Sequence, residues 1–116
     1  MSSVQIDLEE TLYEPGDEVA GRVIWDGAQH EELVLSLLWY TSGKGTEDVE
    51  VTHKETVPNP RPSGELDFRF PLPAFPWSFS GKLISLTWAI EASLEPGGGV
   101  QRVELVSAPD RSELRL

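Results

Sequence analysis

The sequence predicts an all-β domain, an immunoglobulin-like antiparallel β-sandwich of about seven strands. Apolar residues recur at every second position, most clearly from Ile84 to Leu94, where six apolar side chains share one parity. Turn-forming residues interrupt the chain about every ten residues. No segment keeps the apolar periodicity of a helix over several turns. The absence of cysteine excludes a disulfide-pinned antibody-type domain.

The N-terminal half is expected to form four strands. They span residues 4–13, 18–25, 33–41 and 47–57. Pro15 and Gly16 form the first turn, because proline fixes φ and glycine accepts a positive φ. Gly21, inside the second strand, indicates a bulge or a close backbone approach. The glycine-rich segment 42–46 has the composition of a hairpin turn.

The C-terminal half is expected to form three more strands. They span residues 66–70, 84–95 and 100–106, and the second of them is the central strand. The proline-rich connector 57–64 is expected to be an extended loop, since proline cannot donate to a ladder. A second proline-rich loop begins at Pro71, and the glycine run 97–99 predicts a hairpin. The tail 107–116 is expected either to fray or to add an edge strand, and the whole chain 1–116 is interpreted as one domain.

The strand at 33–41 is apolar on both faces. Leu33, Leu35 and Leu37 share one parity, whereas the opposite parity is half apolar. That second set consists of Val34, Ser36, Leu38 and Tyr40. A soluble protein rarely leaves such a stripe exposed without a contact. Three explanations remain open: a homodimer, a partner protein, or a loop of the same chain that covers the stripe.

Charge narrows the classes of partner. The chain has 20 acidic and 9 basic residues, a formal net charge of −11. This balance argues against nucleic acid and against an anionic membrane surface, since both require a basic patch. The N-terminus lacks a secretory signal, and no apolar run is long enough to span a membrane. We therefore expect a cytoplasmic protein without stable membrane insertion, and the partner is expected to be a neutral or cationic protein surface.

No pattern of catalytic or metal-ligating residues stands out. The two histidines, His30 and His53, lack a second histidine at ligand spacing, so both are interpreted as surface residues. The segment 41–46 lacks the first glycine, the Ser or Thr and the following helix of a phosphate-binding loop. We find no Ser-His-Asp order and no nucleophile elbow. The sequence thus predicts neither an enzyme nor a cofactor.

The four tryptophans suggest an alternative function. On a β-sandwich, exposed tryptophans can form a sugar-stacking platform, which would make the chain a carbohydrate-binding module. Trp39 and Trp88 are nevertheless expected in the core, and Trp25 in the core or at its rim, because their neighbours of the same parity are apolar. Trp77, in a loop close to Phe79, is expected to be the most exposed aromatic residue. It either plugs the open end of the sandwich or contacts a ligand.

The order of motifs resembles the arrestin-like domain superfamily. Members carry a Tyr-x-Pro-Gly-Glu-x-Val-x-Gly-x-Val signature, and the segment from Tyr13 to Val23 matches it with one inserted acidic residue. Phe68 to Pro73, the loop Pro76 to Gly81 and the strand with Trp88 are similar to later motifs of the family. The superfamily includes receptor-binding arrestins, retromer cargo subunits and bacterial sporulation-control proteins. Proteins of all three groups have two such domains in tandem, whereas this chain has one. The phosphate-sensing clusters of receptor arrestins have no counterpart here.

The resemblance implies an arrestin-type sandwich that works as a non-enzymatic protein-interaction or scaffold domain. The predicted contact residues come from the second face of strand 33–41 and from the Trp77 loop. They are Val34, Leu38, Tyr40, Trp77 and Phe79.

Overall fold

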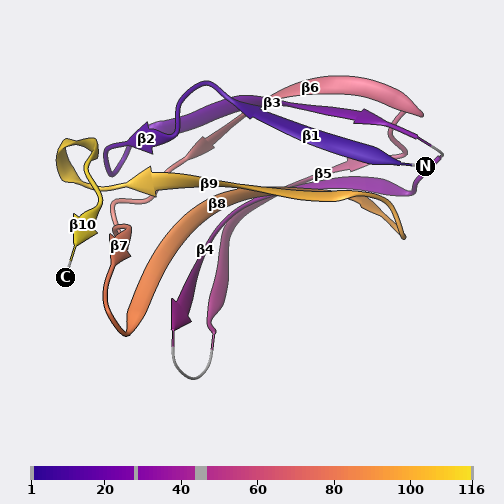
Figure 1. The fold of residues 1–116 in the computed structure, drawn as a ribbon. Helices are drawn as coiled ribbons and strands as arrows, with labels where there is room; N and C mark the ends of the chain where they lie inside the picture. The colour runs from indigo at the N-terminus through magenta and orange to yellow at the C-terminus, as the bar shows by residue number, and fades with distance from the viewer. Residues whose placement is uncertain (1, 28, 44–46, 116) are drawn as a thin grey trace.

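Residues 2–27, 29–43 and 47–115, which the computed structural model describes, form two facing β-sheets (Figure 1). The long strands are β1 (Ser3–Leu8), β3 (Glu18–Asp26), β4 (Glu32–Gly43), β5 (Val49–Pro58), β6 (Ser63–Pro71), β8 (Ile84–Glu95) and β9 (Val100–Ser107). The short ones are β2 (Leu12–Tyr13), β7 (Phe79–Ser80) and β10 (Leu114–Arg115). The predicted all-β sandwich is confirmed, and each of the seven predicted segments contains a strand.

The small sheet has the order β1-β3-β6, with both pairs antiparallel. Its register shows no shift at Gly21, so the bulge alternative is wrong there. A Cβ at Gly21 would lie 2.5 Å from the carbonyl oxygen of Asp7 and 3.0 Å from the ring of Phe68. The close backbone approach predicted for this glycine is therefore confirmed, and any larger residue would push β1 away from β3.

The large sheet is built on β4 and β8. These two strands pair antiparallel over their whole length, from Glu32 opposite Glu95 to Gly43 opposite Ile84. β5 extends the sheet beside β4, while β9 and the short β7 lie beside β8. β10 pairs parallel with β7. Figure 1 shows β4, β5 and the start of β8 extending away from the small sheet at the end where β4 leads into β5.

The hydrophobic core fills the space between the two sheets. Leu33, Leu35 and Leu37 of β4 are fully buried, as are Trp88 and Ile90 of β8. Burying side chains of this size contributes about 2 kcal/mol each to folding. The buried Trp88 indole also donates a hydrogen bond from Nε1 to the carbonyl oxygen of Pro76 at 2.8 Å, which ties the proline-rich loop to the central strand.

Several predicted boundaries are wrong; β4, for example, continues through Ser42 and Gly43 of the predicted turn. The predicted strand 4–13 is two strands, because the chain leaves β3 after Leu8 and reaches β9, where β2 pairs in parallel. β6 begins at Ser63, inside the segment that we expected to be a loop. Trp25 explains this early start: its Nε1 donates to the carbonyl oxygen of Arg61 at 2.7 Å, and Gly64 lets the indole lie directly against the backbone.

The turns follow the predicted chemistry. Gly16 has a φ of 89°, and the Asp17 amide donates to the Glu14 carbonyl oxygen at 3.0 Å, as in a turn with glycine at its third position. The glycine-rich hairpin closes β8 onto β9. β4 and β5 are antiparallel neighbours, as a hairpin requires, but residues 44–46 of the predicted turn lie outside the described residues. In the tail, the 3-10 turn η1 (Pro109–Arg111) precedes β10.

The pH dependence of stability should report on Tyr13. Its side chain is buried, and its hydroxyl has no hydrogen-bond partner in the described part of the chain. Burial raises the pKa of Tyr13 above its ordinary value, and the charges of Glu10 and Glu9 add to this. Above about pH 10 the unfolded chain releases this proton while the folded chain keeps it, so the free energy of unfolding falls as pH rises.

We predict that Tyr13→Phe flattens this alkaline loss of stability. At neutral pH the variant should stay within about 1 kcal/mol of the native chain or exceed it, because it removes a buried hydroxyl without a partner. Urea unfolding at neutral pH and at several pH values above about 10 measures both effects. An alkaline loss of the same size in the variant would contradict the assignment.

Candidate functional site

One face of the large sheet is turned away from the small sheet, and we call it the open face. In β4 it carries Val34, Ser36, Leu38 and Tyr40, since their neighbours of opposite parity belong to the core. Cross-strand partners of these residues extend it into Val49, Val51, Lys54 and Thr56 of β5 and into Thr87, Ala89, Glu91 and Ser93 of β8. Among the described residues no strand packs across this face, because β1, β3 and β6 lie together on the other side (Figure 1).

The side chains of Arg102 and Tyr40, which contact each other, shield the centre of the open face from water. The guanidinium carbon of Arg102 in β9 lies 5.0 Å from the centre of the Tyr40 ring. Arg102 also donates two hydrogen bonds to the Glu91 carboxylate, at 2.7 and 3.0 Å. Along β8, Ala89 lies between the positions that pair with Tyr40 and with Arg102, so this contact passes over Leu38 and Ala89. Leu38 is consequently only 2% exposed although no other strand covers it.

The predicted contact residues of β4 thus lie at different depths. Val34 and Leu38 are buried, whereas Tyr40 is half-buried and reaches the surface. Beyond Tyr40, at the edge of the sheet, Val49 and Val51 are 55% and 49% exposed. Val49 pairs with Tyr40 and Val51 with Leu38, so the apolar surface continues from β4 onto β5. At this end of the open face, the accessible apolar part is therefore Tyr40 together with these two valines.

The Trp77 loop lies apart from the open face. Trp77 is half-buried, its Nε1 donates to the Ala74 carbonyl oxygen at 2.8 Å, and its ring stacks on Phe75 at 5.4 Å. Phe75 is 70% exposed, so the prediction that Trp77 is the most exposed aromatic residue is wrong. Phe79 pairs with the buried Leu86 and packs against the core, on the opposite side of the large sheet from Tyr40.

The other tryptophans do not form a platform. Trp88 and Trp25 are buried, as expected from their neighbours, and Trp39 packs against the core. The indole nitrogens of Trp25 and Trp88 already donate to carbonyl oxygens of their own chain. Among the tryptophans, only Trp77, stacked on Phe75, is therefore placed to contact a sugar ring.

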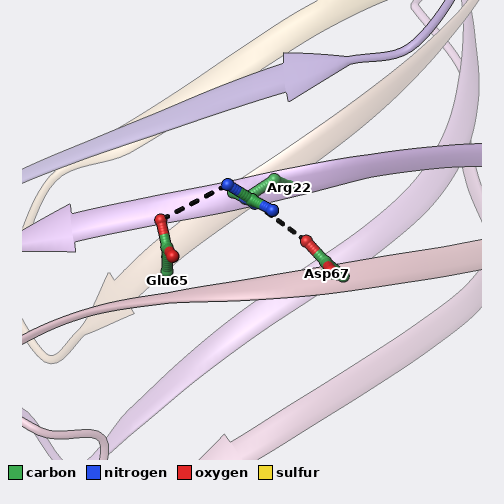
Figure 2. Close-up of polar contacts among 3 residues, drawn as sticks. All are labelled: Arg22, Glu65 and Asp67. Carbon is green, nitrogen blue, oxygen red and sulfur yellow. Dashed lines mark hydrogen bonds and ion pairs between the residues drawn. The ribbon is translucent and has the colours of Figure 1, made fainter.

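The outer face of the small sheet is charged, in contrast to the open face. Figure 2 shows Arg22 between Asp67, at 2.9 Å, and Glu65, at 3.6 Å. Arg69 pairs with Glu18 at 2.9 Å in the same way. The hydrogen bond with Asp67 raises the pKa of Arg22 above its ordinary value. A hollow of about 360 Å³ lies here, but carboxylates line it together with both arginines, so it has no free cationic group for an anion.

The histidines lie apart from each other. His30 donates from Nδ1 to the Pro96 carbonyl oxygen at 3.2 Å and accepts at Nε2 from the Ser2 hydroxyl at 2.8 Å. His53 lies in β5 opposite the core residue Leu37 and beside Phe70, with ring centres 6.4 Å apart. Within the described ranges, no three His, Cys, Asp or Glu side chains are grouped as a metal site would require. In the same residues no helix has the length and apolar character to cross a membrane.

Sequence reasoning missed Arg102 and the valines of β5. The signal for Arg102 was the predicted hairpin around the glycines, because its register places Arg102 directly opposite Glu91. The valines were recognised only as strand residues. Their proximity to Tyr40 depends on the register of β4 and β5, which shifts between Leu37 and Leu38 and could not be read from the alternation alone.

The fold is shared with known proteins of low sequence identity. The crystal structure of Spo0M, a sporulation control protein from Bacillus subtilis, matches 93% of this chain with a TM-score of 0.68 and 20% identity. The chain spans about half of Spo0M, 49% of its length. A β-glucosidase from Listeria innocua in complex with gluconolactone matches 98% of this chain at a TM-score of 0.50 and 12% identity, over 16% of its own length. No protein-family model and no curated protein matches the sequence.

These identities establish a common fold and nothing about activity. The match with a sporulation-control protein shows a shared fold, and membership of the arrestin-like superfamily remains a prediction from the sequence motifs.

The shield over the open face predicts a specific stability effect. Arg102→Ala should lower the free energy of unfolding by about 1 kcal/mol, because it removes a cation–π contact and a partly buried ion pair together. Arg69→Ala is the matched control: it removes a surface ion pair of similar geometry but no contact with a ring, and should cost clearly less, because both partners of that pair are exposed to solvent. Urea unfolding measures both. Equal losses would mean that Arg102 does not cover Leu38.

Proposed function

We propose that the chain is a non-enzymatic protein-interaction or scaffold domain of the arrestin-like superfamily, and that its partner protein binds the open face. The observation that carries the proposal is the accessible apolar surface of this face at Tyr40, Val49 and Val51, across which no strand in the described part of the chain packs. Apolar surface of this kind on a soluble domain usually marks a contact site. The charged outer face of the small sheet is well solvated and offers no such reason to bind a partner.

The residues of the open face take different roles in this proposal. Tyr40 makes the central contact, because its ring presents a large, rigid surface at a low cost in side-chain entropy. Val34 and Leu38 form the floor beneath it and keep the ring in place. Trp77 contributes a second contact region with the exposed Phe75, and Phe79 anchors that loop to the core.

Charge sets the chemistry of the partner. With a net charge of −11, the chain is steered toward neutral or cationic protein surfaces and away from nucleic acid and anionic membranes. Arg102 is already engaged with Glu91 and Tyr40 and therefore does not act as a free basic group. The proposal also includes a cytoplasmic location, since a chain without cysteine has no need of an oxidising compartment.

A carbohydrate-binding module is the second candidate, and the stacked pair Phe75 and Trp77 favours it. The two rings are inclined by only 20°, and Phe75 is largely exposed, which suits the apolar face of a sugar. Titration with soluble oligosaccharides, followed by tryptophan fluorescence, tests this candidate. Saturable quenching that Phe75→Ala abolishes would support it; we expect none.

The test of the main proposal uses exposed residues, because Val34 and Leu38 are too buried to replace without loss of stability. The open-face variant combines Tyr40→Ser with Val100→Ser, since exposed Val100 pairs with Ser93 on the same face. The control variant combines Leu12→Ser with Ile84→Ser, two exposed apolar residues that lie neither on the open face nor in the Trp77 loop. Proteins cross-linked to the native chain in cells are identified, purified and titrated against all three forms.

The open-face variant should bind a purified partner at least about tenfold more weakly, as expected when one central aromatic contact is removed. The control should bind within about twofold. Unfolding curves confirm that both variants fold. The proposal fails if the control weakens binding as much as the open-face variant does. It fails equally if light scattering shows a native dimer that only the open-face variant separates, because the face then serves self-association.

A further inference from the structure

The outer edge of β5 is unprotected over only part of its length. Among the described residues β5 pairs with β4 alone, so its other edge is free. From Thr52 onward this edge carries the features that prevent pairing with another strand: a bulge, the charged Lys54, and Pro58, which has no amide donor. The segment 49–51 has neither a bulge nor a proline, and its one charged residue, Glu50, disfavours only an acidic strand.

The backbone groups of Val49 and Val51 face this free edge. The amide of Thr41 donates to the carbonyl oxygen of Asp48 at 2.9 Å, so the backbone groups of Asp48 point toward β4. In an antiparallel pair, successive residues point their N–H and C=O groups alternately toward and away from the neighbouring strand. Glu50 therefore points its backbone groups toward β4, and the two valines point theirs outward.

The side chains of the same segment alternate in chemistry. Val49 and Val51 lie on the open face, where both are about half exposed. Glu50 pairs with Trp39 and so lies on the opposite side of the sheet, where it is exposed, and exposed Asp48 precedes the strand. A strand added at this edge would place the residues opposite the valines on the open face and the residue opposite Glu50 beside a carboxylate.

A second copy of this chain does not fit that edge. If two β5 strands paired antiparallel with Val49 opposite Val51, the two Glu50 side chains would lie directly opposite each other. Like charges in that position destabilise a strand pair. A strand that alternates apolar with basic residues is complementary at every position instead.

We propose that the edge of β5 at Val49 and Val51 binds an extended, basic segment of a partner protein, which adds to the large sheet as a further strand. The backbone groups of the two valines pair with the segment, its apolar side chains join Tyr40 on the open face, and its Lys or Arg side chains lie beside Glu50 and Asp48. This inference rests on the proposed function and specifies the partner for the same face.

The probe is a short synthetic peptide that alternates valine with lysine, with a valine–glutamate peptide as its control. Added to the native chain at low salt, the lysine peptide should slow the amide hydrogen exchange of Val49 and Val51, and its affinity should fall as salt rises. Val51→Pro removes an outward donor and should weaken binding about tenfold. Val51→Thr, which keeps that donor and a β-branched side chain, should bind within about twofold.

A second measurement keeps the test valid if Val51→Pro does not fold. Peptides N-methylated at one residue at a time are titrated against the native chain, and only alternate positions should lose affinity, because only alternate residues face β5. The inference is overturned if the lysine peptide binds without protecting the two amides, if the glutamate peptide binds equally well, or if neither binds. Dimers held together by β5 would overturn it as well. None of these outcomes changes the weaker partner binding expected for the variant Tyr40→Ser with Val100→Ser. The proposed function is therefore tested independently of this inference.

Discussion

The structure depends on one constraint: β4 is apolar on both of its faces. Leu33, Leu35 and Leu37 enter the core against the small sheet, and this burial holds the two sheets together. The alternation of a strand then forces Val34 and Leu38 onto the other side, where no second layer exists in the described part of the chain. The side chains of Arg102 and Glu91 in the large sheet keep part of that second apolar face away from water.

The protein solves this problem with side chains rather than with another layer. Arg102 reaches from β9 across β8, pairs with Glu91 and lies against the Tyr40 ring, so Leu38 is withdrawn from water. The long arginine stem covers apolar surface while its charged head remains solvated. This arrangement leaves Tyr40 half-buried, with Arg102 over its ring and the exposed valines of β5 beside it.

The limits of sequence reasoning follow from the same physics. Parity along 33–41 and 84–95 was enough to predict the central strands and the doubly apolar character of β4, because one buried face imposes a period of two. The alternation of apolar and polar residues could not predict that Phe75 is exposed, because residues in a proline-rich loop do not alternate between two faces. Nor could it find the role of Arg102 or the proximity of Val51 to Leu38, because both depend on registers between strands. The split of the first strand between two sheets was likewise invisible, because Leu12 continues the even-numbered apolar pattern of Val4 to Leu8, although Leu12 is exposed and Tyr13 is the buried residue of β2.

The open face as a protein-binding surface can be tested most directly by hydroxyl-radical footprinting of the chain, alone and in an extract of the organism that encodes it. At matched radical dose, oxidation should fall at Tyr40, Val49 and Val51 in the extract and stay unchanged at Leu12 and Ile84, which are exposed elsewhere. Protection of Leu12 or Ile84 with Tyr40 still fully oxidised would contradict the assignment and move the contact surface away from the open face.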